Sequence, residues 1–175
     1  MPFPRSARIP ALGLAALSLS GSLALADVSI AFDEGAPKDR FMIVYTGECP
    51  LGPTDVIVDL EGSDGALIFD VAEGGAGVEV FQPIDVILGA EDIAGVSELR
   101  DGDRSVTIRF DRMMPMQHAA FTVDVDDSAG SRPTVVSGAE IRGAKARVAQ
   151  SGAGVLEGTF DDSARALVRV PGCMS

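Results

Sequence analysis

The chain has 175 residues, with 26 acidic and 14 basic side chains and a formal net charge of −12. Such an excess of acid argues against a nucleic-acid partner, because phosphate binding requires clustered Lys and Arg. An apolar share of 46% with regular patterning argues against disorder, and the length suits one domain.

Residues 1–26 have the features of an export signal. Arg5 and Arg8 precede an apolar stretch rich in small residues, which ends in Ala24-Leu25-Ala26, the small-x-small pattern of a signal-peptidase site. Ser and Gly interrupt this stretch and no charged stop-transfer segment follows, which favours cleavage after Ala26 over a membrane anchor. We therefore expect a secreted or periplasmic domain spanning residues 27–175, with a net charge of −14 and no transmembrane segment.

Cys49 and Cys173 are the only cysteines of the chain. A single pair in an exported protein usually forms a disulfide, which here would tie the C-terminal tail to an early loop. Closing so long a loop stabilises by about 4–5 kcal/mol in the chain-entropy model. Two free thiols, or metal ligation by them, are the alternatives.

Apolar and polar residues alternate at a period of two along the mature chain, which predicts about ten short strands. The candidates lie at 28–32, 41–45, 56–60, 66–69, 78–81, 84–88, 105–110, 119–125, 134–137, 144–149, 154–160 and 164–170. Clusters of Gly, Pro, Asp and Ser separate them, and residues 91–99 are expected to form one or two helical turns. This spacing predicts an all-β domain, a β-sandwich or jelly roll, with a closed barrel as the alternative.

The apolar positions of these strands supply the predicted core. Its members are Phe32, Phe41, Ile43, Ile57, Phe69, Val80, Ile108, Phe110, Phe121, Phe160 and Val168.

The common catalytic motifs are absent from the sequence. It contains no GxSxG and no HExxH motif, and His118 is its only histidine. The group of Met113, Met114, Met116 and His118 has the ligand types that suit copper, but a Met-rich loop packed on the core is the favoured reading. We therefore expect no enzyme, although paired carboxylates keep a small polysaccharide hydrolase as a less favoured alternative.

Acidic residues gather in three places that loops could bring together. The acids concerned are Asp124, Asp126 and Asp127, then Asp101 and Asp103, then Glu34 and Asp39. Clustered carboxylates repel one another unless a cation or solvent relieves them, and Ca²⁺ takes 6–8 oxygen ligands. We predict a Ca²⁺ site, with Asp126 and Asp127 as its best candidates; ordinary turns and a solvated acidic surface are the alternatives.

Several segments together resemble a known family. Residues 31–41, 67–70, 75–83, 101–103, 120–127 and 137–144, including the Val-Asp-Val-Asp-Asp stretch at 123–127, are similar to small secreted alphaproteobacterial proteins labelled aggregation factor core. The label refers to the core of sponge cell-aggregation factors. The resemblance implies an extracellular β-rich module, adhesive and Ca²⁺-dependent, adds weight to Asp126 and Asp127, and carries no catalytic residues.

The functional expectation is an exported binding module, stabilised by Ca²⁺, that acts in adhesion, aggregation or recognition of a surface polysaccharide. The alternative is a non-catalytic envelope protein that binds another envelope component. In that case the acidic side chains would serve solubility.

Overall fold

A computed structural model describes residues 25–77, 81–129 and 136–171, and it is all-β. Its strands are Leu25–Asp33 (β1), Asp39–Tyr45 (β2), Thr54–Asp59 (β3), Ile68–Asp70 (β4), Asp85–Leu88 (β5), Ile93–Val96 (β6), Ser105–Phe110 (β7), His118–Asp126 (β8), Lys145–Gln150 (β9), Gly154–Thr159 (β10) and Arg165–Pro171 (β11). A 3-10 turn, Ala90–Asp92 (η1), lies between β5 and β6.

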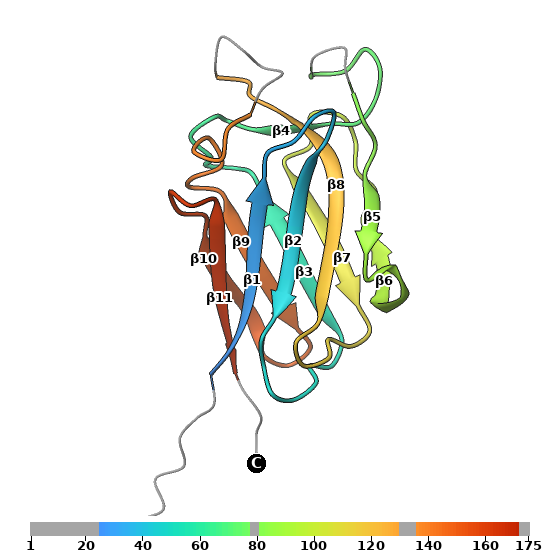
Figure 1. The fold of residues 1–175 in the computed structure, drawn as a ribbon, viewed down its shortest axis with the longest axis vertical. Helices are drawn as coiled ribbons and strands as arrows, with labels where there is room; N and C mark the ends of the chain where they lie inside the picture. Colours follow the sequence, from blue (N-terminus) through green and yellow to red (C-terminus); the bar gives the residue numbers. More distant parts are fainter. Residues whose placement is uncertain (1–24, 78–80, 130–135, 172–175) are drawn as a thin grey trace, which may run out of the picture.

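The strands form two antiparallel sheets, one behind the other (Figure 1). The first has the order β11-β1-β2-β8-β4, with β5 also paired to β8, and the second has the order β10-β9-β3-β7-β6. The long strand β8 therefore contacts β2 along one edge, and β4 and β5 along the other. This arrangement makes the end of β8 a meeting point for several chain segments.

One hydrophobic core draws side chains from both sheets. In β2 every second residue from Asp39 to Tyr45 is buried, as expected for a strand with one face turned inward. Phe41 lies at the centre of an aromatic cluster, with ring centroids 5.1 Å from Phe32, 5.0 Å from Phe121 and 6.4 Å from Phe69. The predicted core is confirmed at nine of its positions.

Two sequence predictions require correction. Residues 91–99 do not form helical turns beyond η1, because Ile93–Val96 pairs with β7 as strand β6. Ile57 is only half-buried, because it alternates with the buried Val56 and Val58 and so lies on the opposite face of β3. Val80 and most of the predicted strands at 78–81 and 134–137 lie outside the described residues.

The N-terminal strand begins before the predicted cleavage point. Leu25 pairs with Pro171 and Ala26 with Val170, so cleavage after Ala26 would remove two residues of β1 and leave its pairing from Asp27 onward. Residues 1–24 lie outside the described part of the chain, and the export signal stays a prediction. Among the residues that the structure does describe, no helix has the length and apolarity needed to cross a membrane.

Candidate functional site: carboxylates at the end of β8

Three chain segments bring carboxylates to the end of β8. Pairing of β4 with β8 sets Asp70 opposite Asp124 and places Asp126 two residues further along the same strand. On the other side of β4, the Phe69 amide donates to the Asp103 carbonyl and the Gly102 amide donates to the Phe69 carbonyl, both at 2.9 Å. These bonds hold Asp101 beside Asp70.

Asp70 is the central and most buried member of this group. Its side chain is 1% exposed, and neither carboxylate oxygen has a hydrogen-bond partner within the described ranges. Burial, together with the neighbouring Asp101 and Asp126 carboxyl groups, raises the pKa of Asp70 to about 8. A buried carboxylate without donors is costly, so this group requires either a proton or a cation.

Asp101 is held by backbone amides of the loop that follows β4. Its Oδ1 accepts from the Val71 amide at 3.1 Å, and its Oδ2 accepts from the Ala76 amide and, at 3.4 Å, from the Gly77 amide. Burial opposes the ionisation of Asp101, but the neighbouring Asp70 carboxyl group and these bonds outweigh it and lower the pKa of Asp101. Asp101 is therefore the anionic partner of Asp70.

The glycines of the loop at residues 71–77 permit its backbone to cross the two carboxyl groups closely. A Cβ atom on Gly77 would lie 2.2 Å from Cγ of Asp70, and one on Gly75 would lie 1.6 Å from Oδ2 of Asp101. Any side chain at either position would displace the loop or the carboxyl groups. This contact explains the glycine-rich stretch at 74–77, which lacks the context of a nucleotide-binding motif.

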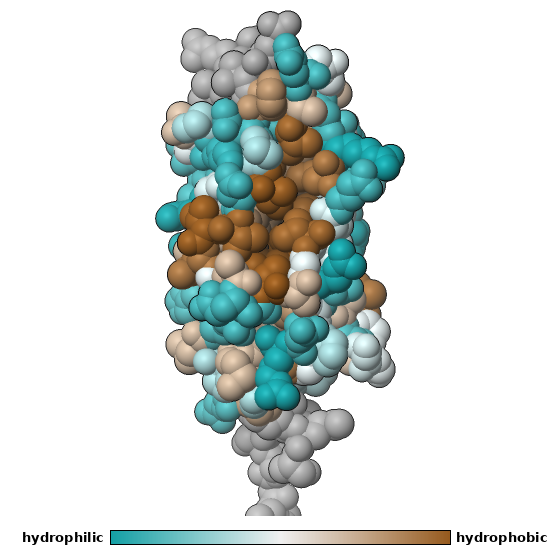
Figure 2. Space-filling model, turned by 90° about the vertical axis from the view of Figure 1, so that its right-hand side faces the viewer, coloured by the Kyte–Doolittle hydropathy of each residue, from teal (hydrophilic) through white to brown (hydrophobic). Residues whose placement is uncertain are grey.

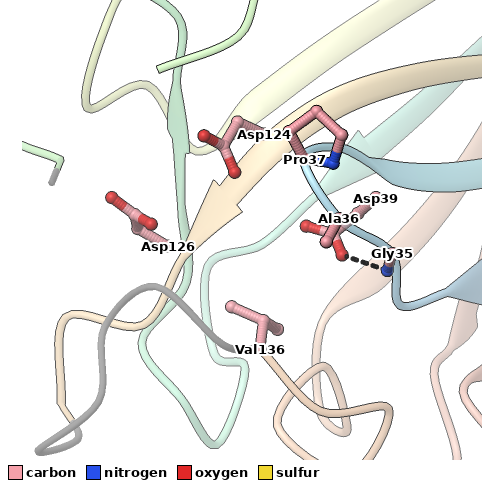
Figure 3. A pocket seen from close by; sticks show the side chains of 7 residues that line it. All are labelled: Gly35, Ala36, Pro37, Asp39, Asp124, Asp126 and Val136. Carbon is pink, nitrogen blue, oxygen red and sulfur yellow. Dashed lines mark hydrogen bonds between the residues drawn. The ribbon is translucent and has the colours of Figure 1, made fainter. Parts of the chain in front are cut away.

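Beside this group lies a cavity of about 530 Å³ (Figure 3). Asp39, Asp124 and Asp126 line it together with residues 35–37 and Val136. Oδ1 of Asp39 accepts a hydrogen bond from the Gly35 amide at 3.0 Å, which turns the β1–β2 loop over the cavity. Asp126 therefore has two roles, since it lines the cavity and also faces Asp70.

The electrostatics of the cavity disfavour several negative charges together. Burial raises the pKa of Asp39 to about 7, with Asp124 adding to the effect and the Gly35 amide opposing it. Burial and the charge of Asp126 raise the pKa of Asp124 to about 6, while Lys38 opposes this shift. A bound cation would relieve the same repulsion.

The remaining predicted acids are engaged elsewhere. Glu34 accepts a hydrogen bond from the Gly138 amide at 3.1 Å, and Asp127 accepts one from the Ala129 amide at 2.6 Å. The Asp103 carboxylate accepts a hydrogen bond from the Arg100 amide at 2.8 Å, which closes the turn at residues 100–103. Gly102 adopts the expected left-handed conformation, with φ at 81°. The Asp101 and Asp103 side chains nevertheless bind different backbone amides and do not converge. Of the predicted acids, the structure thus brings Asp39, Asp124 and Asp126 together at the cavity, and it places Asp101 and Asp126 beside Asp70.

Asp70 was missed by sequence reasoning. It is a single acid after the apolar run at 67–69, and no local signal separates it from any acid that ends a strand. Only the pairing of β4 with β8 reveals its position.

The donor types at this end of β8 suit a hard cation such as Ca²⁺, and the unpartnered oxygens of Asp70 fit such an ion. In the described part of the chain, no group of three or more His, Cys, Asp or Glu side chains already has the arrangement of a metal site. Binding would therefore require the carboxylates to close around the ion.

The methionines near His118 separate rather than converge. Met113 is 1% exposed within the core, whereas Met114 and Met116 are 45% and 63% exposed. This distribution favours a packing role for Met113 over a shared metal site.

No family model matches the chain, and neither a curated protein nor a solved structure matches it.

Proposed function

We propose that this protein is an exported β-sandwich binding module stabilised by Ca²⁺, acting in adhesion or in recognition of a surface polysaccharide. The observation that carries the metal part is Asp70, whose two buried oxygens lack partners between Asp101 and Asp126. The adhesive part is supported by the resemblance to aggregation factor core proteins. The sandwich assignment is supported by the single core drawn from two sheets.

The chain's own residues suggest how the ion would be held. Asp70, Asp101 and Asp126 would supply carboxylate oxygens, and the amides that bind Asp101 would keep it ionised and oriented. The ion would supply positive charge that offsets the repulsion among the three groups. Because Asp126 also lines the cavity beside Asp124, an occupied site would restrain one wall of that cavity.

Calcium is expected to raise the melting temperature of the mature protein. Binding to the folded state alone at ten to a hundred times Kd contributes about 1.4–2.7 kcal/mol, which for a domain of this size corresponds to about 3–11 °C. The measurement is thermal unfolding at pH 7.5 across a Ca²⁺ titration from micromolar to about 10 mM, the range of extracellular modules.

Chelation with EDTA should reverse the shift, and Mg²⁺ at the same concentration should produce a smaller one because it demands a stricter geometry. A melting temperature indifferent to Ca²⁺ across this range removes the metal from the proposal. Binding of the protein to polysaccharide is a separate measurement, so the adhesive part is tested independently.

The strand pairing supports the proposed disulfide between Cys49 and Cys173 as far as Pro171, where the described residues end. The Thr46 amide, just before the loop with Cys49, bonds the Asp27 carbonyl at 2.9 Å, and β1 pairs with the end of β11 at Pro171. The loop after β2 and the end of β11 thus lie at the same end of the sheet (Figure 1). Cys173 itself lies outside the described residues.

Intact-mass spectrometry of exported protein is expected to show a chain two hydrogens lighter than the fully reduced form, with both cysteines protected from alkylation until a reductant is added. Alkylation of both thiols without reductant would contradict the pairing.

A further inference from the structure

A contiguous apolar surface lies in the middle of the side of the molecule that carries β5 and β6, with hydrophilic residues around it (Figure 2). Ile87 and Leu88 of β5 are 54% and 45% exposed, although they are large aliphatic side chains. Four further apolar residues of this segment are only partly buried while packing against the core: Ile84, Ile93, Val96 and Leu99. Contiguous exposed apolar surface of this kind marks interaction sites more often than chance exposure does.

Among the described residues, both sheets end with an unpaired strand edge at this surface. Within the described ranges β5 pairs with β8 alone and β6 with β7 alone, and β5 does not pair with β6. At the opposite side of the molecule, by contrast, β10 and β11 approach so closely that a Cβ atom on Gly158 would lie 2.4 Å from the Leu167 carbonyl oxygen. The sandwich is therefore closed on one side and open on the side of β5 and β6.

The charged residues at 81–99 indicate the charge that a partner of this surface would have. Residues 81–99 contain four acids and no Lys or Arg. Lys38 pairs with Asp85 and Arg100 with Glu98, whereas in the described part of the chain no basic side chain pairs with Glu91 or Asp92. Arg109 of β7 lies beside Gly95 of β6, so the two unpaired acids leave the border of this surface weakly negative, which complements a partner with basic residues.

The same charges disfavour a second copy of this chain. A two-fold contact would set each acidic border against itself, and like charges directly opposite one another are destabilising.

We propose that the β5–β6 edge is a docking surface for an extended segment of another protein that has alternating apolar side chains and Lys or Arg at its ends. Such a segment adds main-chain hydrogen bonds to a free edge and inserts apolar side chains between the two sheets, the mode of β-strand addition. This proposal is independent of the Ca²⁺ site, which lies at the far end of β8 from the Leu88–Ala120 pair.

The test uses the mature protein and synthetic peptides of about ten residues with alternating Val and Thr. One peptide carries Lys at both ends, a second carries Glu there, and a third keeps the Lys ends but has Ser in place of Val. Binding is measured by fluorescence anisotropy at low ionic strength and again at about 0.5 M salt, where charge attraction is screened. We expect saturable binding of the Lys-ended Val peptide alone, weakened by salt.

Two variants with a matched charge change locate the binding. Ile87→Lys is expected to weaken binding by about tenfold or more, since it breaks the apolar surface and repels the peptide ends. Val155→Lys alters an equally exposed aliphatic residue, 61% exposed on β10, and should leave binding unchanged. Equal melting temperatures of the two variants verify that both are folded.

Several outcomes would overturn the proposal. These are absence of saturable binding up to about 1 mM peptide, the upper limit of weak specific recognition, equal binding of the Ser or Glu peptides, and equal weakening by both variants. Concentration-dependent dimerisation in sedimentation that Ile87→Lys abolishes would assign the surface to a second copy instead.

Discussion

In the metal-free protein at pH 8, Asp70→Asn is expected to unfold at a higher temperature than the wild type. The asparagine amide can donate hydrogen bonds to the neighbouring carboxylates of Asp101 and Asp126, whereas no group among the described residues donates to the wild-type carboxylate. Replacing a buried carboxylate that has no donor by an uncharged amide that can donate is worth about 1–3 kcal/mol, or about 2–12 °C for a domain of this size. Thermal unfolding in EDTA provides the measurement.

The gain should depend on pH in a defined direction. The pKa values of Asp70, Asp39 and Asp124 are raised from 3.8 to about 8, 7 and 6, so between about pH 4 and pH 8 the folded state binds more protons than the unfolded state. The free energy of unfolding of the metal-free wild type therefore falls as the pH rises through this range. Asp70→Asn removes the group with the highest of these pKa values, so its advantage should be larger at pH 8 than at pH 5.

The same variant distinguishes a cation from a shared proton. If Asp70 binds Ca²⁺, Asp70→Asn should lose most of the calcium-dependent rise in melting temperature, whereas the exposed Asp111→Asn should retain it. A variant that is less stable than the wild type in EDTA at every pH would contradict the unsatisfied state of Asp70. A full calcium response in Asp70→Asn would exclude this residue as a ligand.

Phe41→Ala is expected to have the largest effect on stability. The ring is fully buried and contacts three other aromatic rings, which come from β1, β4 and β8. Truncating a buried phenylalanine costs about 3–5 kcal/mol, because transfer energy is lost and a cavity remains. The free energy of unfolding of natural domains is only about 5–15 kcal/mol. We therefore expect Phe41→Ala to unfold at a much lower urea concentration than the wild type.

The neighbouring Arg40→Ala is the matched control for this strand. Arg40 faces solvent and pairs with Asp33 across β1 and β2, with both side chains 47% exposed, so its loss should cost less than about 1 kcal/mol. Equilibrium unfolding in urea compares the two variants. Similar urea midpoints for Phe41→Ala and the wild type would show that the aromatic cluster contributes little to the stability of the fold.

The strands were largely predictable because alternation at a period of two reports which face of a strand is buried. The segment 105–110, for example, was predicted and observed as one strand, β7, in which residues 106, 108 and 110 are buried. β6 was missed because Ile93–Val96 contains only small and aliphatic residues without polar alternation, and its strand character depends on pairing with β7. The inward assignment of Ile57 failed because a continuous apolar run does not reveal which alternate residues face the core.

The acidic group at the end of β8 was only partly predictable. Composition and loop spacing identified Asp101, Asp124 and Asp126 as candidates, since dense carboxylates are visible in one dimension. They could not distinguish Asp101 from Asp103, whose separate hydrogen-bond partners are backbone amides of different loops. They also could not reveal Asp70, because its burial is created by a neighbouring strand and by the glycine loop that crosses it.

The net charge of −12, the alternating strands and the all-β class follow from the sequence itself, because each depends on residue type and on spacing within a few residues. Which of the 26 acids meet, and that one of them is buried without a donor, was decided only by the tertiary structure. The physical reason is that strand pairing joins residues more than 50 positions apart, as it joins Asp70 to Asp124, and burial acts on the assembled site. The open apolar edge at β5 and β6 has the same origin, since a free edge exists only once the strand order of both sheets is set.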